Sequence, residues 1–389
     1  MSQLLESRWS ETKEALLEGL QGNKRSVMAT TLENTRKYLS ESATAGATSA
    51  GNVATLNRVI LPVIRRVMPT VIANELVGVQ PMTGPVGQIH TLRVRYSDTF
   101  AGSVGGATTA GEEALSPFKI AEGYSGATTG KPASTAALEG VAGNKLSIQI
   151  LKQTVEAKTR KLSARWTFEA AQDAQAQQGI DIEAEIMAAL AQEITAEIDQ
   201  EVLRSLASLS STVLTYDQAA VSGTATFVGD EHAALAVQIN RAANLIAQRT
   251  RRGAGNWAVV SPTTLTLLQS ATTSAFARTT EGTFEAPTNT KFVGTLNSAM
   301  KVYVNTYAEN DNVLVGYKGG SESDAAAFYC PYIPLMSSGV VLDPATFEPV
   351  VSFMTRYGYV ELTNTASSLG NAADYLATVA VTSANLRFA

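Results

Sequence analysis

The sequence predicts an α+β fold in which helices and strands are interleaved along the chain. Three patterns predict it: a long helical pattern at 167–208, a strand-like alternation at 88–96, and repeated switching between the two periods from 214 to 362. The chain has 389 residues, and one hydrophobic core stops growing at roughly 250 to 300 residues. We therefore expect more than one domain.

The composition favours a protein that buries much of its surface against copies of itself. Charged residues make up 17% of the chain, against about 25% in an average soluble domain, while the hydrophobic content of 45% is ordinary. Interface cores are depleted of charge, so extensive oligomerisation is expected. The net charge of −5 disfavours a nucleic-acid binder, which usually carries a basic stripe.

Residues 1–50 are predicted to form an N-terminal arm. Residues 2–22 have the apolar spacing of an amphipathic helix, and a second, short helical stretch ends at Leu39. The small polar residues that follow predict an extended linker, so we expect the arm to dock on a neighbouring subunit or a scaffold. The N-terminus lacks the apolar core of a secretory signal, and no run of about 18 apolar residues predicts a membrane span.

Residues 53–73 show helical spacing interrupted by two prolines, and residues 88–96 alternate as a strand with two distinct faces. Residues 97–145 are rich in Gly, Ala, Thr and Ser, and the following segment KLSIQILKQTVEAK alternates again. The simplest interpretation is one long β-hairpin whose Gly-rich tip lies across a neighbouring subunit, since a loop of this length is unusual inside a compact domain.

The helix predicted at 181–208 carries isoleucine or another aliphatic residue at every fourth position. Each step of four drifts by roughly 40° around an α-helix, so the apolar stripe winds and its two ends must pack on different partners. Gly179 and Asp181 predict a break before this helix. Farther along, helices are expected at 230–252 and 263–271, and strands at 257–262, 301–307, 312–318 and 325–335. A last strand is expected within 347–362, before the apolar segment YLATVAVTSANL.

The sequence predicts no catalytic, cofactor-binding or metal-binding residues, and hence no enzyme. The only histidines, His90 and His232, lie in different predicted elements. Cys330 lies in an apolar strand and is expected to be a buried thiol without catalytic function. Residues 126–132 (GATTGKP) resemble a phosphate-binding loop, but they are one residue short and have proline where a hydroxyl is required.

Arg251 and Arg252 form the one local basic cluster and precede Gly253 and Gly255. One interpretation is a helix C-cap, in which a glycine takes the left-handed conformation. The other is a salt bridge between subunits. The sequence leaves both open.

Five strings in the same order resemble the major capsid protein of T-even-like tailed bacteriophages. The first is GVQPM at 78–82 with Pro85, the second EAK at 156–158 with AQD at 171–173, and the third RG at 252–253 with GN at 255–256. The fourth is VGYKG at 315–319 with PY at 331–332, and the fifth is DP at 343–344 with TRYG at 355–358.

The resemblance implies an HK97-type capsid fold with four parts. It assigns residues 1–50 to the N-terminal arm and 84–148 to the E-loop with a reduced insertion. It assigns 51–83, 149–213 and 343–389 to the P domain, whose spine helix is at about 181–208, and 214–342 to the A domain.

The resemblance also implies a protein that assembles with itself into hexamers and pentamers and encloses double-stranded DNA without sequence-specific binding. It would act in the virion after assembly in the host cytoplasm, with portal, scaffold and decoration proteins as further partners and with no membrane. Relatives lose a propeptide after Leu/Ile-x-Glu triplets, and position favours Glu41 among the matching triplets here, but retention of the arm is favoured over cleavage. An encapsulin-like nanocompartment shell and a flagellin-like filament are the alternatives.

The residues expected at contacts between copies are Trp9, Arg93, Arg95, Glu112, Glu113, Lys131, Arg251, Arg252, Lys318 and Arg356.

Overall fold

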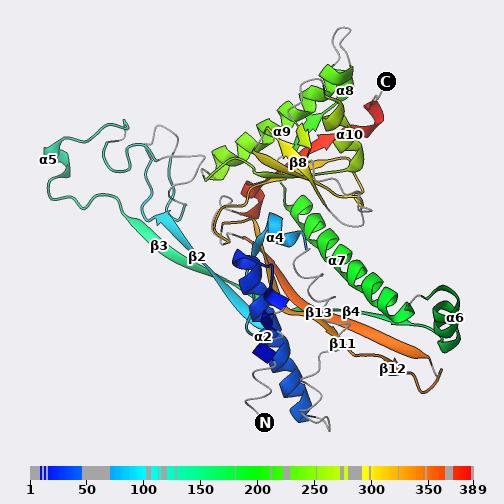
Figure 1. Ribbon diagram of the computed structural model, residues 1–389. Coiled ribbons are helices and arrows are strands. Elements are labelled where there is room, and N and C mark those ends of the chain that lie inside the picture. The colour runs from blue at the N-terminus through cyan, green and yellow to red at the C-terminus, as the bar shows by residue number, and fades with distance from the viewer. Residues whose placement is uncertain are drawn as a thin grey trace. The chain divides into compact units, whose positions relative to one another are not determined.

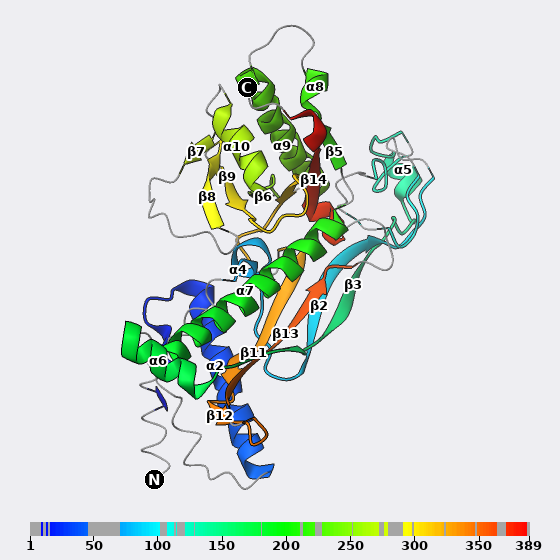
Figure 2. The same ribbon diagram turned by 90° about the vertical axis from the view of Figure 1, so that its right-hand side faces the viewer.

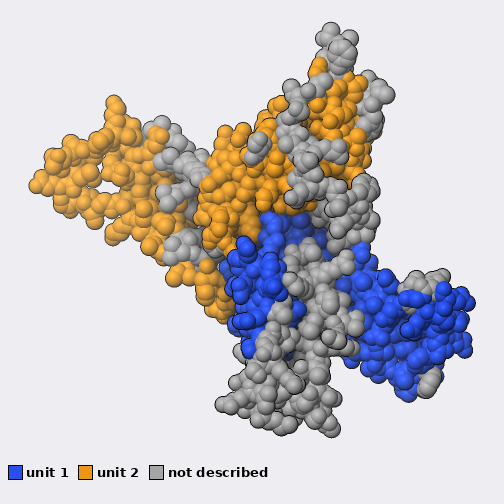
Figure 3. Space-filling model, in the orientation of Figure 1, with its two compact units in different colours: residues 1–87, 154–203, 328–360 blue, residues 88–153, 204–327, 361–389 orange. Residues whose placement is uncertain are grey.

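The computed structural model describes residues 9–10, 13–14, 16–45, 71–101, 107–112, 114, 121–127, 129–179, 181–210, 213–221, 228–250, 252–271, 276–278, 291–297, 299–322, 324–346, 348–363 and 371–386. It mixes helices with three β-sheets, which confirms the α+β class (Figure 1). The chain divides into two compact units (Figure 3). Unit 1 holds residues 1–87, 154–203 and 328–360, and unit 2 holds 88–153, 204–327 and 361–389.

Unit 1 is built on a sheet in which β1 (Gly78–Val79), β11 (Ala327–Ser337) and β13 (Pro349–Glu361) are neighbours in that order. Strand β4 (Lys158–Arg165) pairs antiparallel with β13, and β12 (Val341–Leu342) pairs with the start of β13. Along β13 buried and half-buried side chains alternate, so one face of the strand is covered. Figure 2 shows α7 (Ile182–Leu209) running along this sheet.

The break predicted before the long helix is confirmed. Helix α6 (Phe168–Gln178) begins with the Thr167 side chain accepting a hydrogen bond from the Ala170 N–H. It ends at Gly179, whose φ of 68° is the left-handed conformation that glycine adopts without steric cost. The Asp181 side chain then accepts the Glu183 N–H at 3.1 Å and starts α7.

Helix α2 (Gly22–Ala45) corrects the predicted arm in two respects. It continues beyond Leu39, because residues 40–45 contain two alanines and no glycine or proline to stop a helix. It is also not free: Met28 and Leu32 are buried, and the Asn34 amide donates to the carbonyl oxygens of Met82 and Tyr332 at 2.5 and 3.1 Å. Residues 9–10, 13–14 and 16–17 are helical as predicted, whereas 53–70 lie outside the described residues.

Unit 2 contains a seven-stranded sheet in the order β5-β14-β10-β6-β9-β8-β7. The strands are β5 (Val213–Tyr216), β14 (Leu376–Val381), β10 (Val313–Gly316), β6 (Trp257–Val260), β9 (Met300–Val304), β8 (Lys291–Leu296) and β7 (Phe276–Arg278). Helix α9 (Val228–Thr250) packs on β5, β10 and β14 and lies beside α10 (Pro262–Ser270). Its aliphatic side chains and those of the central strands form one buried core.

Two strands pair with segments that are distant from them in sequence. Strand β11, expected in the A domain with 214–342, pairs with β1 in the sheet of unit 1. Strand β14, expected in the P domain with 343–389, lies between β5 and β10 in unit 2. Periodicity carries no information about such pairing, so these strand neighbours could not be predicted from the sequence.

The predicted hairpin is confirmed. Strands β2 (Val86–Tyr96) and β3 (Leu146–Glu156) form a two-stranded sheet, with the short helix α5 (Thr135–Leu138) in the tip (Figure 1). Hydrogen bonds join Ala157 N to Pro85 O and Ser97 N to Lys145 O. The two residue numbers add up to the same total in both pairs, so one antiparallel register holds from one end of the ribbon to the other.

Candidate assembly surfaces

The β2–β3 ribbon carries an exposed apolar row. Leu146, Ile148 and Ile150 alternate along β3, so they share one face, and their exposed fractions are 58%, 68% and 66%. A two-stranded ribbon is marginally stable in water on its own, and contiguous exposed apolar side chains mark interaction sites. The row therefore requires a partner surface.

The tip of the hairpin is folded around one buried tyrosine. Tyr124 lies 4.7 Å from the Tyr96 ring, and its hydroxyl donates to Lys145 O at 2.7 Å while accepting from Asp98 N at 3.1 Å. The Asn144 amide donates to Tyr124 O, and Asp98 accepts the Lys145 N–H. The described part of the Gly-rich tip therefore has an aromatic centre, which the sequence analysis did not identify among the small residues.

We expect Tyr124→Phe to loosen the tip without unfolding either unit. The substitution keeps the ring but removes the partner of the Lys145 carbonyl and of the Asp98 N–H, which are only partly buried, at a cost of about 0.5 to 1.5 kcal/mol. Limited proteolysis should cut residues 97–145 several-fold faster in the variant, while the thermal transition of the remainder is unchanged. Equal cleavage rates would show that the hydroxyl does not hold the tip.

A charged network joins α7 to the sheet of unit 1. Arg160 on β4 contacts Glu197 at 2.7 Å and Glu201 at 2.5 Å, and its Nε donates to the Tyr357 hydroxyl at 2.5 Å. Tyr357 donates in turn to Glu201. Burial alone would raise the pKa of Glu201, but the hydrogen bonds from Tyr357 and Arg160 outweigh it and hold that pKa below its usual value. Burial and the bond to Glu201 raise the pKa of Tyr357. The network fixes the spine helix to the sheet.

Asp199 is the buried carboxyl group of α7, with 1% exposure. One oxygen accepts the Ile72 N–H at 2.8 Å, just before α4 (Ala73–Leu76), and Oδ2 has no partner among the described residues. Burial raises the pKa of Asp199 to about 7, against the opposing effect of the bond from Ile72. A group that titrates near neutral pH therefore lies inside unit 1, and nothing in the sequence distinguishes Asp199 from the other acidic residues of α7.

Unit 2 contains a polar cluster that pairs the buried His232 with Ser270, an exposed serine. His232 Nδ1 lies 2.6 Å from Ser270 Oγ, and His232 Nε2 lies 3.4 Å from the Gln218 amide nitrogen, which donates to Glu231 at 2.8 Å. Because the amide donates towards Nε2, Nδ1 carries the proton and donates to Ser270, whose hydroxyl donates to Leu267 O. In this tautomer the histidine donates to the serine, and the cluster joins α8 (Gln218–Val221), α9 and α10.

The described part of the chain is free of two kinds of site, a metal-binding cluster and a membrane-spanning helix. That part has no group of three His, Cys, Asp or Glu residues able to hold a metal, and no helix there is long and apolar enough to cross a membrane. Cys330 is buried as predicted, and burial raises the pKa of its thiol to about 12, so it is unreactive.

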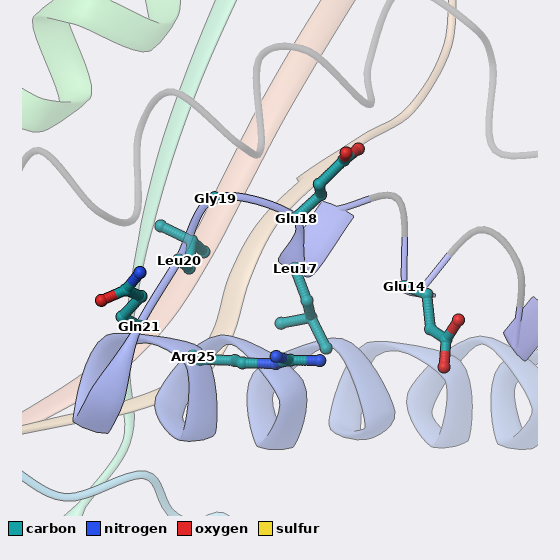
Figure 4. Close-up of a pocket in the computed structure, with 7 residues that line it drawn as sticks. All are labelled: Glu14, Leu17, Glu18, Gly19, Leu20, Gln21 and Arg25. Atoms are coloured by element: carbon teal, nitrogen blue, oxygen red, sulfur yellow. The ribbon is translucent and has the colours of Figure 1, made fainter.

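A hollow of about 560 Å³ on the arm is lined by residues 14, 17–21 and 25 (Figure 4). Its lining contains no serine, threonine, cysteine or histidine.

The helix-capping interpretation of Arg252–Gly253 is corrected by the structure. Gly253 and Gly255 are not among the residues with positive φ. Packing requires Gly253 instead, since a Cβ there would lie 2.7 Å from the Tyr317 ring. Arg252 forms an ion pair with Asp324 of the same chain at 2.5 Å, and its carbonyl accepts the Tyr317 hydroxyl. The cluster thus anchors the 317–325 loop within unit 2.

The remaining residues expected at contacts between copies are scattered and do not form one site. Arg95 is buried, so it is not presented to a partner, whereas Lys131 is exposed. Trp9 donates to Glu33 at 3.4 Å, Glu112 accepts the Thr109 N–H, Lys318 pairs with Glu322, and Arg356 lies 5.3 Å from the Tyr332 ring centre. Glu113, Arg251 and the side chains of Arg93 and Glu41 lie outside the described residues, although Glu41 belongs to α2.

Comparisons with known proteins agree on one family. A family model for the major capsid protein Gp23 matches residues 53–381. The chain is 30% identical to the major capsid protein of Vibrio phage KVP40, over 85% of this chain and 82% of that protein. It is also 30% identical to the major capsid protein of Enterobacteria phage T4, over 82% and 78% respectively.

Solved structures similar to the chain come from phages. One from Mycobacterium phage Bobi has a TM-score of 0.46 at 16% identity, covering 79% of this chain and 89% of that one. The capsid of Myoviridae phage XM1 has a TM-score of 0.43 at 10% identity, covering 79% and 91%.

Proposed function

This chain belongs to the Gp23 family of major capsid proteins, and on that premise we propose that it forms hexamers and pentamers that close into an icosahedral or prolate phage head. Capsid proteins of this family assemble into shells with copies of themselves, and their location is the virion capsid. The family match places the chain with capsid proteins and not with encapsulins or flagellins. The family is structural, in agreement with a chain whose sequence predicts no active site.

The apolar row of the β2–β3 ribbon is the observation that carries the proposal. Unit 2 would supply the A domain at the centre of each capsomer, and the ribbon would be the E-loop that overlaps a neighbour. With Leu146, Ile148 and Ile150 exposed, the isolated subunit is incomplete until another copy covers them. Many contacts of standard size need not be individually tight, because simultaneous engagement multiplies their strength.

The finer parts of the proposal concern partners and compartment. The acidic net charge of −5 suits a wall that encloses double-stranded DNA without binding particular sequences. Assembly would take place in the host cytoplasm, with portal, scaffold and decoration proteins as further partners.

Cleavage after Glu41 would separate most of α2 from the chain, although Asn34 and the buried Met28 and Leu32 would still hold the cut helix in unit 1.

Electron microscopy of the purified chain tests the proposal directly. We expect closed polyhedral shells or tubes. A discrete dimer under all assembly conditions, or one that turns over a substrate, would contradict it.

We expect deletion of residues 1–41 to weaken both the subunit and the contacts between capsomers. The deletion uncovers the apolar surface beneath Met28 and Leu32 and leaves the Met82 and Tyr332 carbonyls without the Asn34 amide. Loss of two such side chains costs about 4 to 10 kcal/mol by analogy with large-to-alanine substitutions. The measurements are the melting temperature of the subunit and the yield of particles. Particles that match the wild type in both would contradict a structural role for the arm.

A further inference from the structure

Helix α6 is almost unburied in the single subunit. None of its side chains that the structure describes is buried, and Phe168 at its start is 44% exposed. Isolated helices shorter than about 12 residues are marginal in water, and α6 has 11. Its capping by Thr167 and Gly179 defines its ends but supplies no packing. The helix therefore needs a surface on which to lie.

The charge of this region is strongly segregated along the chain. From Trp166 to Leu203 there are nine acidic residues and no lysine or arginine. Glu169, Asp173 and Asp181 among them are exposed. Strand β4, which ends just before this stretch, carries four basic residues and no acid. A surface that covers α6 should therefore be basic.

One face of the sheet in unit 1 presents such a surface, which we call the basic strip. Paired residues of β4 and β13 share this face: Arg165 with Val350, Ser163 with Ser352, Lys161 with Met354 and Thr159 with Arg356. The four β4 members are exposed and the β13 members are half-buried. The opposite face carries Arg160, which is occupied by Glu197 and Glu201 of α7.

The charges of the basic strip are little neutralised by the residues that the structure describes. Arg165 is 71% exposed and reaches Glu348 at 3.6 Å, a long and solvent-accessible pair of little energetic value. Arg356 lies over the Tyr332 ring, which leaves its charge uncompensated by a carboxylate in that contact. Lys161 and Arg356 are diagonal neighbours across the strand pair, about 7 to 8 Å apart at Cα by sheet geometry.

The dimensions of the two surfaces match. Eleven residues of α-helix extend about 16 Å, and the strand from Thr159 to Arg165 extends about 20 Å. Glu169, Asp173 and Gln177 lie one helical turn apart on one side of α6, with Cβ spacings of about 5 to 6 Å. A helix lying along the strip would therefore place its acids within reach of Lys161 and Arg356.

We propose that α6 of one copy docks on the basic strip of a second copy, and that this contact is part of the shell. Both surfaces are exposed on the same subunit and differ from each other, so the contact is head-to-tail and propagates from copy to copy. Complementary charge would set the register of neighbours and make assembly sensitive to salt. The inference rests on the proposed self-assembly and specifies two of the surfaces that carry it.

A charge-swap series tests the contact. The strip variant is Lys161→Glu with Arg165→Glu. The helix variant is Asp173→Lys with Gln177→Lys, in the C-terminal half of α6 where lysine favours the helix dipole. We expect either variant alone to lower the yield of shells at least about tenfold at low salt, since like charges then meet at every copy of the contact. The chain that carries all four substitutions should recover most of the wild-type yield.

The controls separate this contact from folding and from assembly itself. Circular dichroism and the melting temperature of the subunit should be unchanged in every variant, and Arg241→Glu, an exposed reversal on α9, should assemble normally. If the wild-type chain forms no shells, both the proposed function and this contact are overturned. If the wild type assembles and the single-surface variants match it, or if the four-substitution chain is not rescued, this contact alone is overturned.

Discussion

Replacement of Ile148 and Ile150 by aspartate is expected to abolish shell formation while leaving the subunit folded. The two side chains are 68% and 66% exposed, so neither supports the core of the subunit. Full burial of an isoleucine contributes about 1.5 to 3 kcal/mol. Because about two-thirds of each side chain is still exposed in the subunit, about two-thirds of that free energy is available to each contact between copies, and the variant loses it. The aspartates add the cost of burying unpaired charge.

The geometry of β3 supplies a matched control for this prediction. Ser147 and Gln149 alternate with the two isoleucines and are also exposed, but on the other face of the ribbon. Ser147→Asp with Gln149→Asp introduces the same charge on the same strand. Sedimentation velocity and electron microscopy should show shells for the control and free subunits or small oligomers for the isoleucine variant. Shells from both would remove the apolar row from the assembly contact.

The local elements of this fold were predictable because their signals are local. Helix α7 and its start follow from the aliphatic periodicity and from Gly179 and Asp181, and the ribbon follows from two alternating segments. Strand β4 was missed because KTRKLSAR has few apolar residues, and an edge strand with one exposed face requires few. Helix α2 extends beyond the predicted end at Leu39, since small polar residues alone do not stop a helix.

The long-range arrangement and the buried polar groups were not predictable. The strand partners of β11 and β14 could not be predicted, because paired residues such as Gly78 and Phe328 are 250 positions apart in the sequence. The exposed row at Leu146–Ile150 has the same alternation as a half-buried strand, so exposure depends on what covers it, which lies in other segments or other chains. Asp199 and His232 became notable only when their burial and neighbours were known.

The buried Asp199 makes unit 1 less stable as the pH rises towards neutrality. Its pKa is about 7 in the folded chain, against an ordinary value of 3.8. Below pH 4 the group is protonated in both states and has no effect. Between about 4 and 7 the unfolded chain releases the proton while the folded chain retains it, so the free energy of unfolding falls. At pH 8 the accumulated penalty is about 4 kcal/mol, from three pKa units at about 1.4 kcal/mol each.

Asp199→Asn should therefore stabilise the subunit at pH 8 and have much less effect at pH 5. The amide oxygen can still accept the Ile72 N–H, and the neutral side chain avoids the penalty of burying a charge. Its NH2 group costs about 1 to 3 kcal/mol of stability at every pH if it finds no acceptor. The decisive measurement is the difference in unfolding free energy between variant and wild type as a function of pH, which should increase by about 3 kcal/mol from pH 5 to pH 8. Asp173→Asn, at an exposed position on α6, is the matched control, because it makes the same substitution away from the buried site. A flat profile for Asp199→Asn would mean that Asp199 keeps an ordinary pKa in the folded chain and is reached by water or by a cation.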